Sequence, residues 1–94
     1  MSETGERVIV TVIGEDRIGI IAEVTRILAD ARVNIVDISQ TIMQEFFVMI
    51  LLADLKHATI AFEELKASLV KKGEELGMRI DAQHQDVFRY MHRI

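Results

Sequence analysis

Two stretches of this chain are apolar on both faces when extended, and they restrict the fold more than any other feature of the sequence. Residues 7–14 (RVIVTVIG) are rich in β-branched side chains and end at a glycine, which is typical of a β-strand. Residues 46–53 (FFVMILLA) have turn-like flanks and a short length, which favour a strand over a buried helix. Strands without polar alternation belong inside a sheet, because both of their faces are covered there. The sequence therefore predicts a sheet with these two strands at its centre.

Two amphipathic helices are predicted between the strands. After a polar connection, apolar residues recur with helical spacing up to residue 31, and Asp16 is the candidate N-cap. The same spacing returns over residues 59–76, where Thr59 is the candidate cap and Gly77 is placed to end the helix. Each helix therefore has one apolar face to bury against the sheet.

The remaining strands alternate in polarity, as expected at the edges of a sheet. Residues 33–43 (VNIVDISQTIM) place Val36 and Ile38 on one face, which we expect to be buried, and polar side chains on the other. Residues 78–83 (MRIDAQ) show the same alternation. Residues 86–93 are predicted to form a short amphipathic helix at the C-terminus.

The predicted order of elements is β-α-β-β-α-β, followed by the short helix. Right-handed crossovers favour a ferredoxin-like α+β fold, with a four-stranded antiparallel sheet in the order 4-1-3-2 and both long helices on one face. This order places the two apolar strands in the centre, so the pattern and the topology agree. Residues 1–6 are predicted to be a flexible tail, residues 7–84 one domain, and residues 85–94 a helix that packs on the sheet or on a partner protomer.

One face of the predicted sheet is left without long helices. Ile9, Thr11 and Ile13, together with alternate residues of 46–53, are expected to face water there. An exposed apolar surface of this kind marks an interface. We therefore expect a homodimer, and we expect the helix over residues 85–94, from its own chain or from its partner, to cover this face.

The composition argues against several classes of function. The chain has 94 residues, no cysteine and a net charge of −4, which argues against disulfides, thiolate metal sites, cysteine nucleophiles and a nucleic-acid partner. It shows no secretory signal and no apolar run of about 20 residues, so no membrane association is expected and a cytoplasmic protein is predicted. The three histidines are far apart in the sequence, and neither a metal site nor a cofactor is predicted.

Two other kinds of protein share this topology. An acylphosphatase-type enzyme needs an Arg and an Asn at an anion-cradling loop; Arg17 and Asn34 make this conceivable, but the loop lacks the required glycine-rich pattern. An RNA-recognition domain stacks bases on aromatic residues of its central strands, whereas Phe46 and Phe47 lie at the start of a strand. The chain has neither a P-loop nor a nucleophile signature, so no catalytic activity is expected.

Residues 8–20 (VIVTVIGEDRIGI) carry a signature that points to a family. A β-branched strand ends at a glycine, the polar loop EDRIG leads into a helix, and the next strand begins with VNI. This combination resembles the ACT domain family over residues 7–83. Residues 33–47 are similar to the small stand-alone ACT proteins of bacteria and archaea. The chain also resembles the ACT domains of the glycine cleavage repressor and of formyltetrahydrofolate deformylase.

The resemblance implies a small regulatory module that binds an amino acid or a related metabolite where two protomers meet. In such domains the loop after the first strand and the start of the second strand supply the ligand contacts. Carried onto this chain, these positions are Asp16, Arg17, Ile18, Gly19, Asn34 and Ile35. An enzyme or regulator would be the further partner. The alternative is a structural protein–protein interaction module with no small-molecule ligand.

The polar and glycine positions of this set also have simpler roles. Asp16 can receive a ligand's ammonium group or only cap the helix, and Arg17 can pair with a carboxylate or remain solvated. Gly19, expected in the first helical turn, can allow close approach of a ligand or only fit the loop into the helix. Asn34 offers a donor and an acceptor to an amino acid's backbone, and it is also a common residue before a strand. The helix N-terminus itself suits a carboxylate.

Overall fold

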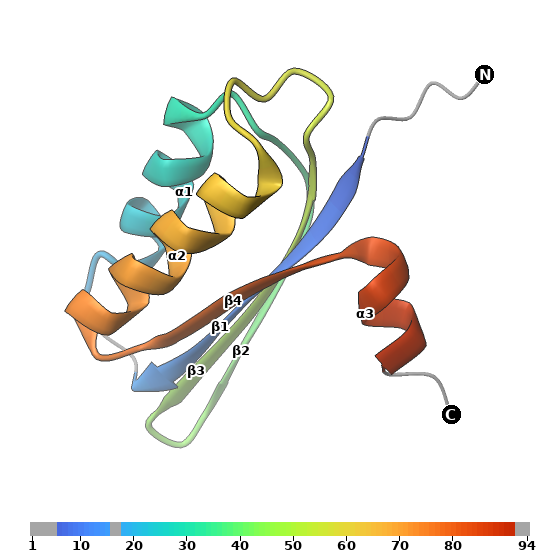
Figure 1. Ribbon diagram of the computed structural model, residues 1–94. Helices are drawn as coiled ribbons and strands as arrows, with labels where there is room; N and C mark the ends of the chain where they lie inside the picture. The colour runs from blue at the N-terminus through green and yellow to red at the C-terminus, as the bar shows by residue number, and fades with distance from the viewer. Residues whose placement is uncertain (1–5, 16–17, 92–94) are drawn as a thin grey trace.

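The computed structural model describes residues 6–15 and 18–91 (Figure 1). Along these residues the secondary structure follows the order β-α-β-β-α-β-α. The elements are β1 (Arg7–Glu15), α1 (Ile20–Asp30), β2 (Asn34–Met43), β3 (Phe46–Asp54), α2 (Phe62–Leu76), β4 (Arg79–His84) and α3 (Gln85–Met91). The strands form one antiparallel sheet in the order β2-β3-β1-β4, which confirms the predicted ferredoxin-like fold and its topology.

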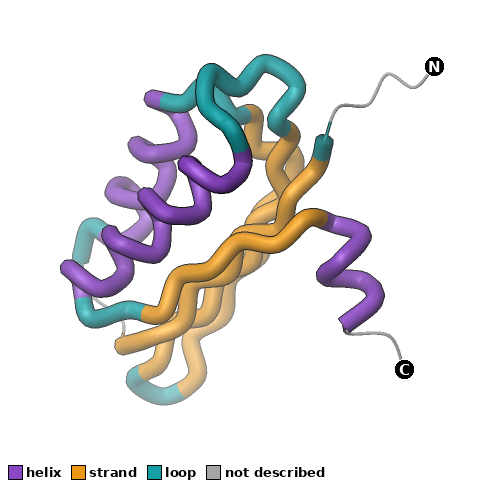
Figure 2. The backbone as a smooth tube through the Cα atoms, viewed as in Figure 1, coloured by secondary structure: helices purple, strands orange, loops and turns teal. Residues whose placement is uncertain are grey.

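The two long helices pack side by side on one face of the sheet, and α3 lies on the opposite side (Figures 1 and 2). The core fills the space between the sheet and the two long helices. Val10 and Val12 of β1 are fully buried there, as are Leu51 of β3 and Leu69 of α2. No polar or charged side chain among the described residues is buried, so the side chains of this core are held together by apolar contacts.

The register between the two central strands determines which side chains face away from the long helices. Because side chains alternate along a strand, the neighbours of the buried Val10 and Val12 point to the other face. Thr11 lies opposite Ile50, and Ile13 lies opposite Val48. Ile13 and Ile50 keep 44% and 40% of their surface exposed. The apolar face expected from the sequence is therefore present and incompletely covered within one chain.

The prediction that Val36 and Ile38 share a buried face is wrong. A β-bulge between Ile35 and Asp37 interrupts the pairing with β3 at Val36. Val36 and Ile38 remain 41% and 43% exposed, and Ile35 is the most buried residue of the strand, at an intermediate level. The reason is that β2 lies at the edge of the sheet, where the long helices cover little more than its start.

The end of α2 is as predicted, whereas its start is not. Gly77 takes the left-handed conformation, with φ 71°, and ends the helix as expected. The helix begins at Phe62 after Ala61, so the prediction that Thr59 caps it is wrong. Thr59 instead donates its backbone N–H to the carbonyl oxygen of Ala31 at 2.9 Å. This hydrogen bond ties the loop before α2 to the end of α1.

Candidate functional site

The first half of the predicted ligand site is the connection from β1 to α1. Asp16 and Arg17 lie outside the described residues, so their ligand contacts stay predictions. Gly19, not Asp16, occupies the N-cap position of α1, with φ 91° and ψ −2° and no side-chain hydrogen bond. The prediction that Asp16 caps the helix is therefore wrong. The backbone N–H of Glu23 donates to the carbonyl oxygen of Gly19 at 2.9 Å and closes the first turn.

The backbone conformation of Gly19 explains why a glycine stands there. A φ of 91° is a conformation that residues with a Cβ rarely adopt. A Cβ added at this position would meet no other atom within 4 Å. Within one protomer the glycine is thus required by the turn rather than by close packing. Ile18, the residue before it, is fully exposed. An apolar side chain and open space therefore border the start of α1.

The second half of the predicted site is the start of β2. Asn34 is the first residue of this strand and pairs with Asp54 of β3. Its side chain is exposed and makes no hydrogen bond within the described segments. Ile35 is half-buried against the core, opposite Ala53. The Asn34 amide is thus the polar group available to a ligand here, and Ile35 anchors the strand beneath it.

The two halves lie at opposite ends of α1. Gly19 precedes the helix, and Asn34 follows it after the short turn over residues 31–33. With a rise of about 1.5 Å per residue, the 11 residues of α1 separate the two ends by about 16 Å. A single amino acid does not span that distance. One protomer therefore does not bring Gly19 and Asn34 to the same ligand.

A shallow groove lies between α1 and the start of β2 on the outer side of the molecule. Its volume is about 540 Å³, and its lining residues are Ala22, Thr25, Arg26 and Ala29 of α1 with Val33, Asn34 and Ile35. The four α1 residues have the spacing i, i+3, i+4 and i+7, which places them on one helical face. Three of them are small, so a second helix can approach this face closely.

Arg26 is a residue of this groove that was not among the predicted site residues. It is exposed and has no ion-pair partner among the residues that the structure describes. A guanidinium donates to a carboxylate, and the oxygen of an Asn amide accepts from an ammonium group. Arg26 and Asn34 together therefore offer partners for both ends of an amino acid. The signal in the sequence was a single Arg within a stripe of small residues on the outer face of the helix.

The charged groups with shifted pKa values lie on another side of α1. Lys72 of α2 is 3.0 Å from the carboxylate of Glu75 and 3.7 Å from that of Glu23 in α1. The hydrogen bond and charge of Glu75 raise the pKa of Lys72, and Lys72 in turn lowers the pKa of Glu75. This exposed bridge links the two long helices and takes no part in the groove.

Neither a metal cluster nor a membrane-spanning helix is found in the part of the chain that the structure describes. No three His, Cys, Asp or Glu side chains there are grouped so that they could hold a metal ion. His84 is 3.0 Å from the Glu6 carboxylate, and its ring centre lies 4.1 Å from that of Phe62. His57 is exposed, and His92 lies outside the described residues. No described helix is long and apolar enough to cross a membrane.

Comparison with known proteins gives matches along most of the chain. A family model described as ACT domain matches residues 6–83. A UPF0237 protein of Methanocaldococcus jannaschii is 53% identical over 88 residues, which cover 94% of this chain and 98% of the relative. The structure of an ACT domain protein from Streptococcus pneumoniae has a TM-score of 0.78 and 32% sequence identity, and the match covers 90% of this chain and 96% of that chain.

Two more distant structures are similar in fold alone. One is described as a glycine cleavage system transcriptional repressor, with a TM-score of 0.76, 21% identity, and coverage of 85% of this chain and 46% of the other. The other is a formyltetrahydrofolate deformylase from Pseudomonas syringae, with a TM-score of 0.78, 18% identity, and coverage of 87% and 28%. Both similarities expected from the sequence are confirmed at the level of the fold.

Proposed function

Because the chain belongs to the ACT domain family, we propose that it is a non-catalytic regulatory module that binds an amino acid or a related metabolite between two copies of itself. ACT domains are in general regulatory ligand-binding modules. The observation that carries the proposal is the separation of the two predicted contact regions. Gly19 and Asn34 lie at opposite ends of α1, so the site is incomplete in one protomer.

A second copy completes the site if it pairs through the β2 edges. β2 is a ten-residue strand at the edge of the sheet, and such an edge presents unpaired backbone N–H and C=O groups to another strand. Antiparallel pairing about a two-fold axis would set the start of one β2 against the end of the other. Because α1 begins at the end of the sheet where β2 finishes, Asn34 of one copy would approach Gly19 of its partner.

The outer face of α1 suits the same arrangement. Ala22, Thr25 and Ala29 present small side chains beside β2, so the two copies of α1 can pack against one another as their β2 strands pair. The two helices would run antiparallel, which again places the start of one beside the end of the other. The groove beside β2 would then be closed by the partner into a crevice.

The crevice would hold groups for both ends of an amino acid. The start of α1 supplies unpaired backbone N–H groups and a partial positive charge, and Arg26 adds a guanidinium. These groups bind the carboxylate. The Asn34 oxygen accepts a hydrogen bond from the ammonium group. A ligand held by both protomers binds the paired form better than the single chain, so it shifts the population toward the pair, and this change is the regulatory signal.

Isothermal titration calorimetry of the full chain with each amino acid at millimolar concentration tests this proposal. We expect heat from a narrow group of amino acids, and we expect Asn34→Ala to weaken binding of the best of them at least tenfold. Glu64→Ala, on the exposed surface of α2, is the control and should bind as the wild type does. The proposal fails if no amino acid gives heat or thermal stabilisation, or if Asn34→Ala binds unchanged.

A further inference from the structure

The open face of the sheet is its apolar surface on the side away from α1 and α2. From β1 it contains Ile9, Thr11 and Ile13, and from β3 it contains Phe46, Val48, Ile50 and Leu52. Polar residues border it on both edge strands, with Ser39 and Thr41 on β2 and Asp81 and Gln83 on β4. An apolar centre with a polar rim is the anatomy of a protein interface. This surface is separate from the β2 edge and from the groove beside α1.

The open face is covered at one end and uncovered at the other. α3 contacts β1 and β4 of its own chain, and Ile9, near the end of the sheet from which α3 leaves, is only 8% exposed. At the other end, which we call the bare end, Ile13 and Phe46 are 44% and 46% exposed. The last residue of β2, Met43, pairs with Phe46 there and is also exposed. The chain's own C-terminal helix thus leaves half of the face to solvent.

α3 itself presents an apolar side chain to solvent. Val87 on this helix is 44% exposed. The helix stands on the open side of the sheet, where Figure 1 shows it apart from the long helices. One face of the molecule therefore presents a projecting apolar helix at one end and a bare apolar surface at the other.

We infer that this face is a second self-association surface, on which another copy of this chain docks face to face. A two-fold axis near the central Thr11–Ile50 pair exchanges the two ends of the face. It places α3 of each copy over the bare end of the other, so that Val87 meets the surface around Ile13. Such an interface is isologous, because the same two patches meet twice.

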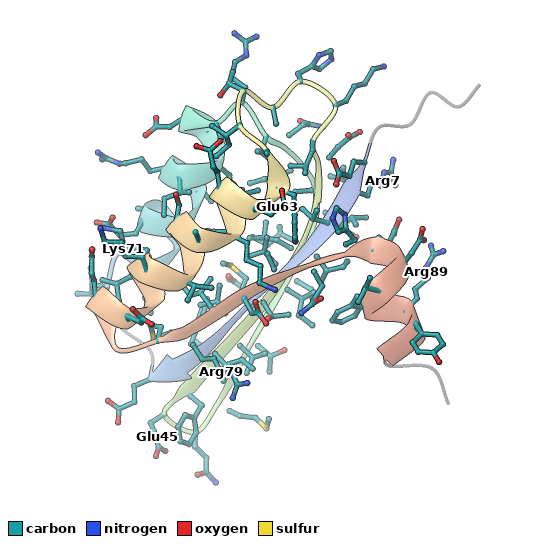
Figure 3. All side chains as sticks on the ribbon, viewed as in Figure 1. Arg7, Glu45, Glu63, Lys71, Arg79 and Arg89 are labelled. Atoms are coloured by element: carbon teal, nitrogen blue, oxygen red, sulfur yellow. The ribbon has the colours of Figure 1, made fainter. Side chains whose placement is uncertain are left out.

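The charges at the two ends are partly complementary in this arrangement. Arg89 is exposed on α3, and Glu15 and Glu45 are exposed at the bare end, where Arg79 of β4 is also exposed opposite Ile13. Figure 3 shows Arg89 and Glu45 at opposite ends of the molecule, with Arg79 near Glu45. None of these four side chains has an ion-pair partner among the described residues. Docking about the two-fold axis would bring the cation of each α3 toward an end of the other copy that holds two carboxylates and one guanidinium.

The size of the face also fits a second copy. Four strands spaced by about 4.8 Å, each with about eight residues at a rise of about 3.4 Å, span a projected area of about 500 Å². The chain's own α3 covers one end of this area, and the outer side of α3 takes the place of the covered part. A specific interface buries about 800 Å² on each partner, so the face together with α3 is of the right order.

Measurement of mass by light scattering after gel filtration tests the inference with three forms of the full chain. Ile50→Lys places a charge beside the proposed axis, where it would face its own copy, and the 40% exposure of Ile50 allows the single chain to hold a Lys there. We expect the mass of Ile50→Lys to be half that of the wild type. Ala67→Lys adds the same charge to an exposed site on α2 and should keep the wild-type mass.

The outcome does not depend on the proposed β2 pairing. If both interfaces exist, the wild type contains four chains and Ile50→Lys contains two. If only the face pairs, the wild type is a dimer and Ile50→Lys is a monomer. A mass of Ile50→Lys equal to that of the wild type would overturn the inference, and it would leave the ligand crevice unaffected.

A disulfide experiment supplies a positional test, because the natural chain contains no cysteine. A tagged Val87→Cys chain is mixed with an untagged Ile13→Cys chain and oxidised gently. We expect a mixed disulfide between the two. Val87→Cys mixed with Ala67→Cys, whose thiol lies on the helix side of the molecule, is the control. Equal yields in the two mixtures would overturn the inference.

Discussion

Replacement of Gly19 by Ala tests the finding that a left-handed turn, rather than close packing, sets the identity of this residue. An L-residue in the left-handed region costs about 1–2 kcal/mol. Ala also restricts the unfolded chain, which offsets about 0.4–1 kcal/mol of that cost. No steric cost is added, because a Cβ at Gly19 meets nothing within 4 Å. The expected net loss is therefore about 1 kcal/mol of unfolding free energy.

Thermal unfolding followed by circular dichroism measures this loss. For a domain of this size, about 1 kcal/mol lowers Tm by about 4–8 °C. Protein concentration is held constant, because self-association would shift Tm by mass action. Gly19→Asn serves as the matched variant, since Asn tolerates the left-handed region better, and it should lose less than Gly19→Ala.

A Gly19→Ala chain as stable as the wild type would contradict the role of the left-handed turn. Local geometry would then not explain the glycine, and close approach by a ligand or a partner backbone would be its remaining role. If Gly19→Asn were the less stable of the two, the left-handed conformation would also be in doubt.

Three further outcomes follow from the packing and the charges. Leu69→Ala, at a fully buried position, should lower the free energy of unfolding measured with denaturant by about 2–5 kcal/mol. Ser68→Ala, at an exposed position, should change it by less than about 0.5 kcal/mol, and similar losses in the two variants would contradict the described core. Gly73→Ala should also lower the Tm of the protein, because the added Cβ would lie 2.7 Å from the backbone oxygen of Met78. Ala by itself favours a helix over Gly, so a higher Tm would refute this close packing. Lys72→Met should flatten the pH dependence of Tm at both extremes. The lowered pKa of Glu75 gives stability above its ordinary value of 4.5 that is lost as the pH falls, and the raised pKa of Lys72 gives stability below 10.5 that is lost as the pH rises. Unchanged pH profiles in low salt would contradict the bridge.

The fold was predictable because local pattern and topology required the same arrangement. The absence of polar alternation in residues 7–14 and 46–53 placed these strands at the centre, and the right-handed crossovers left one order for the sheet. The glycine at position 77 was placed correctly, because it directly follows the last apolar residue of the helix. These signals depend on neighbouring residues and on the spacing of apolar side chains, and both can be read directly from a sequence.

The errors arose where tertiary context overrides a local pattern. Asp16 and Thr59 are good capping residues, but α1 begins only at Ile20, after Gly19, and α2 begins only at Phe62, after Ala61. The bulge at Val36 has no signature in an alternating strand, and the exposure of Ile38 depends on how far α1 reaches along the sheet edge. Arg26 enters the candidate site because β2 lies beside the outer face of α1, and helical periodicity alone does not reveal that.

In the proposed pair the ligand crevice is shared between two chains, with the start of α1 from one and the start of β2 from the other. An isotope-filtered NOE experiment on a mixture of ¹³C-labelled and unlabelled chains tests it most directly. We expect contacts between the methyl groups of Ile18 in one chain and the side chain of Asn34 in another, strengthened by a bound amino acid. A sample that self-associates but shows no contact between these residues would contradict it.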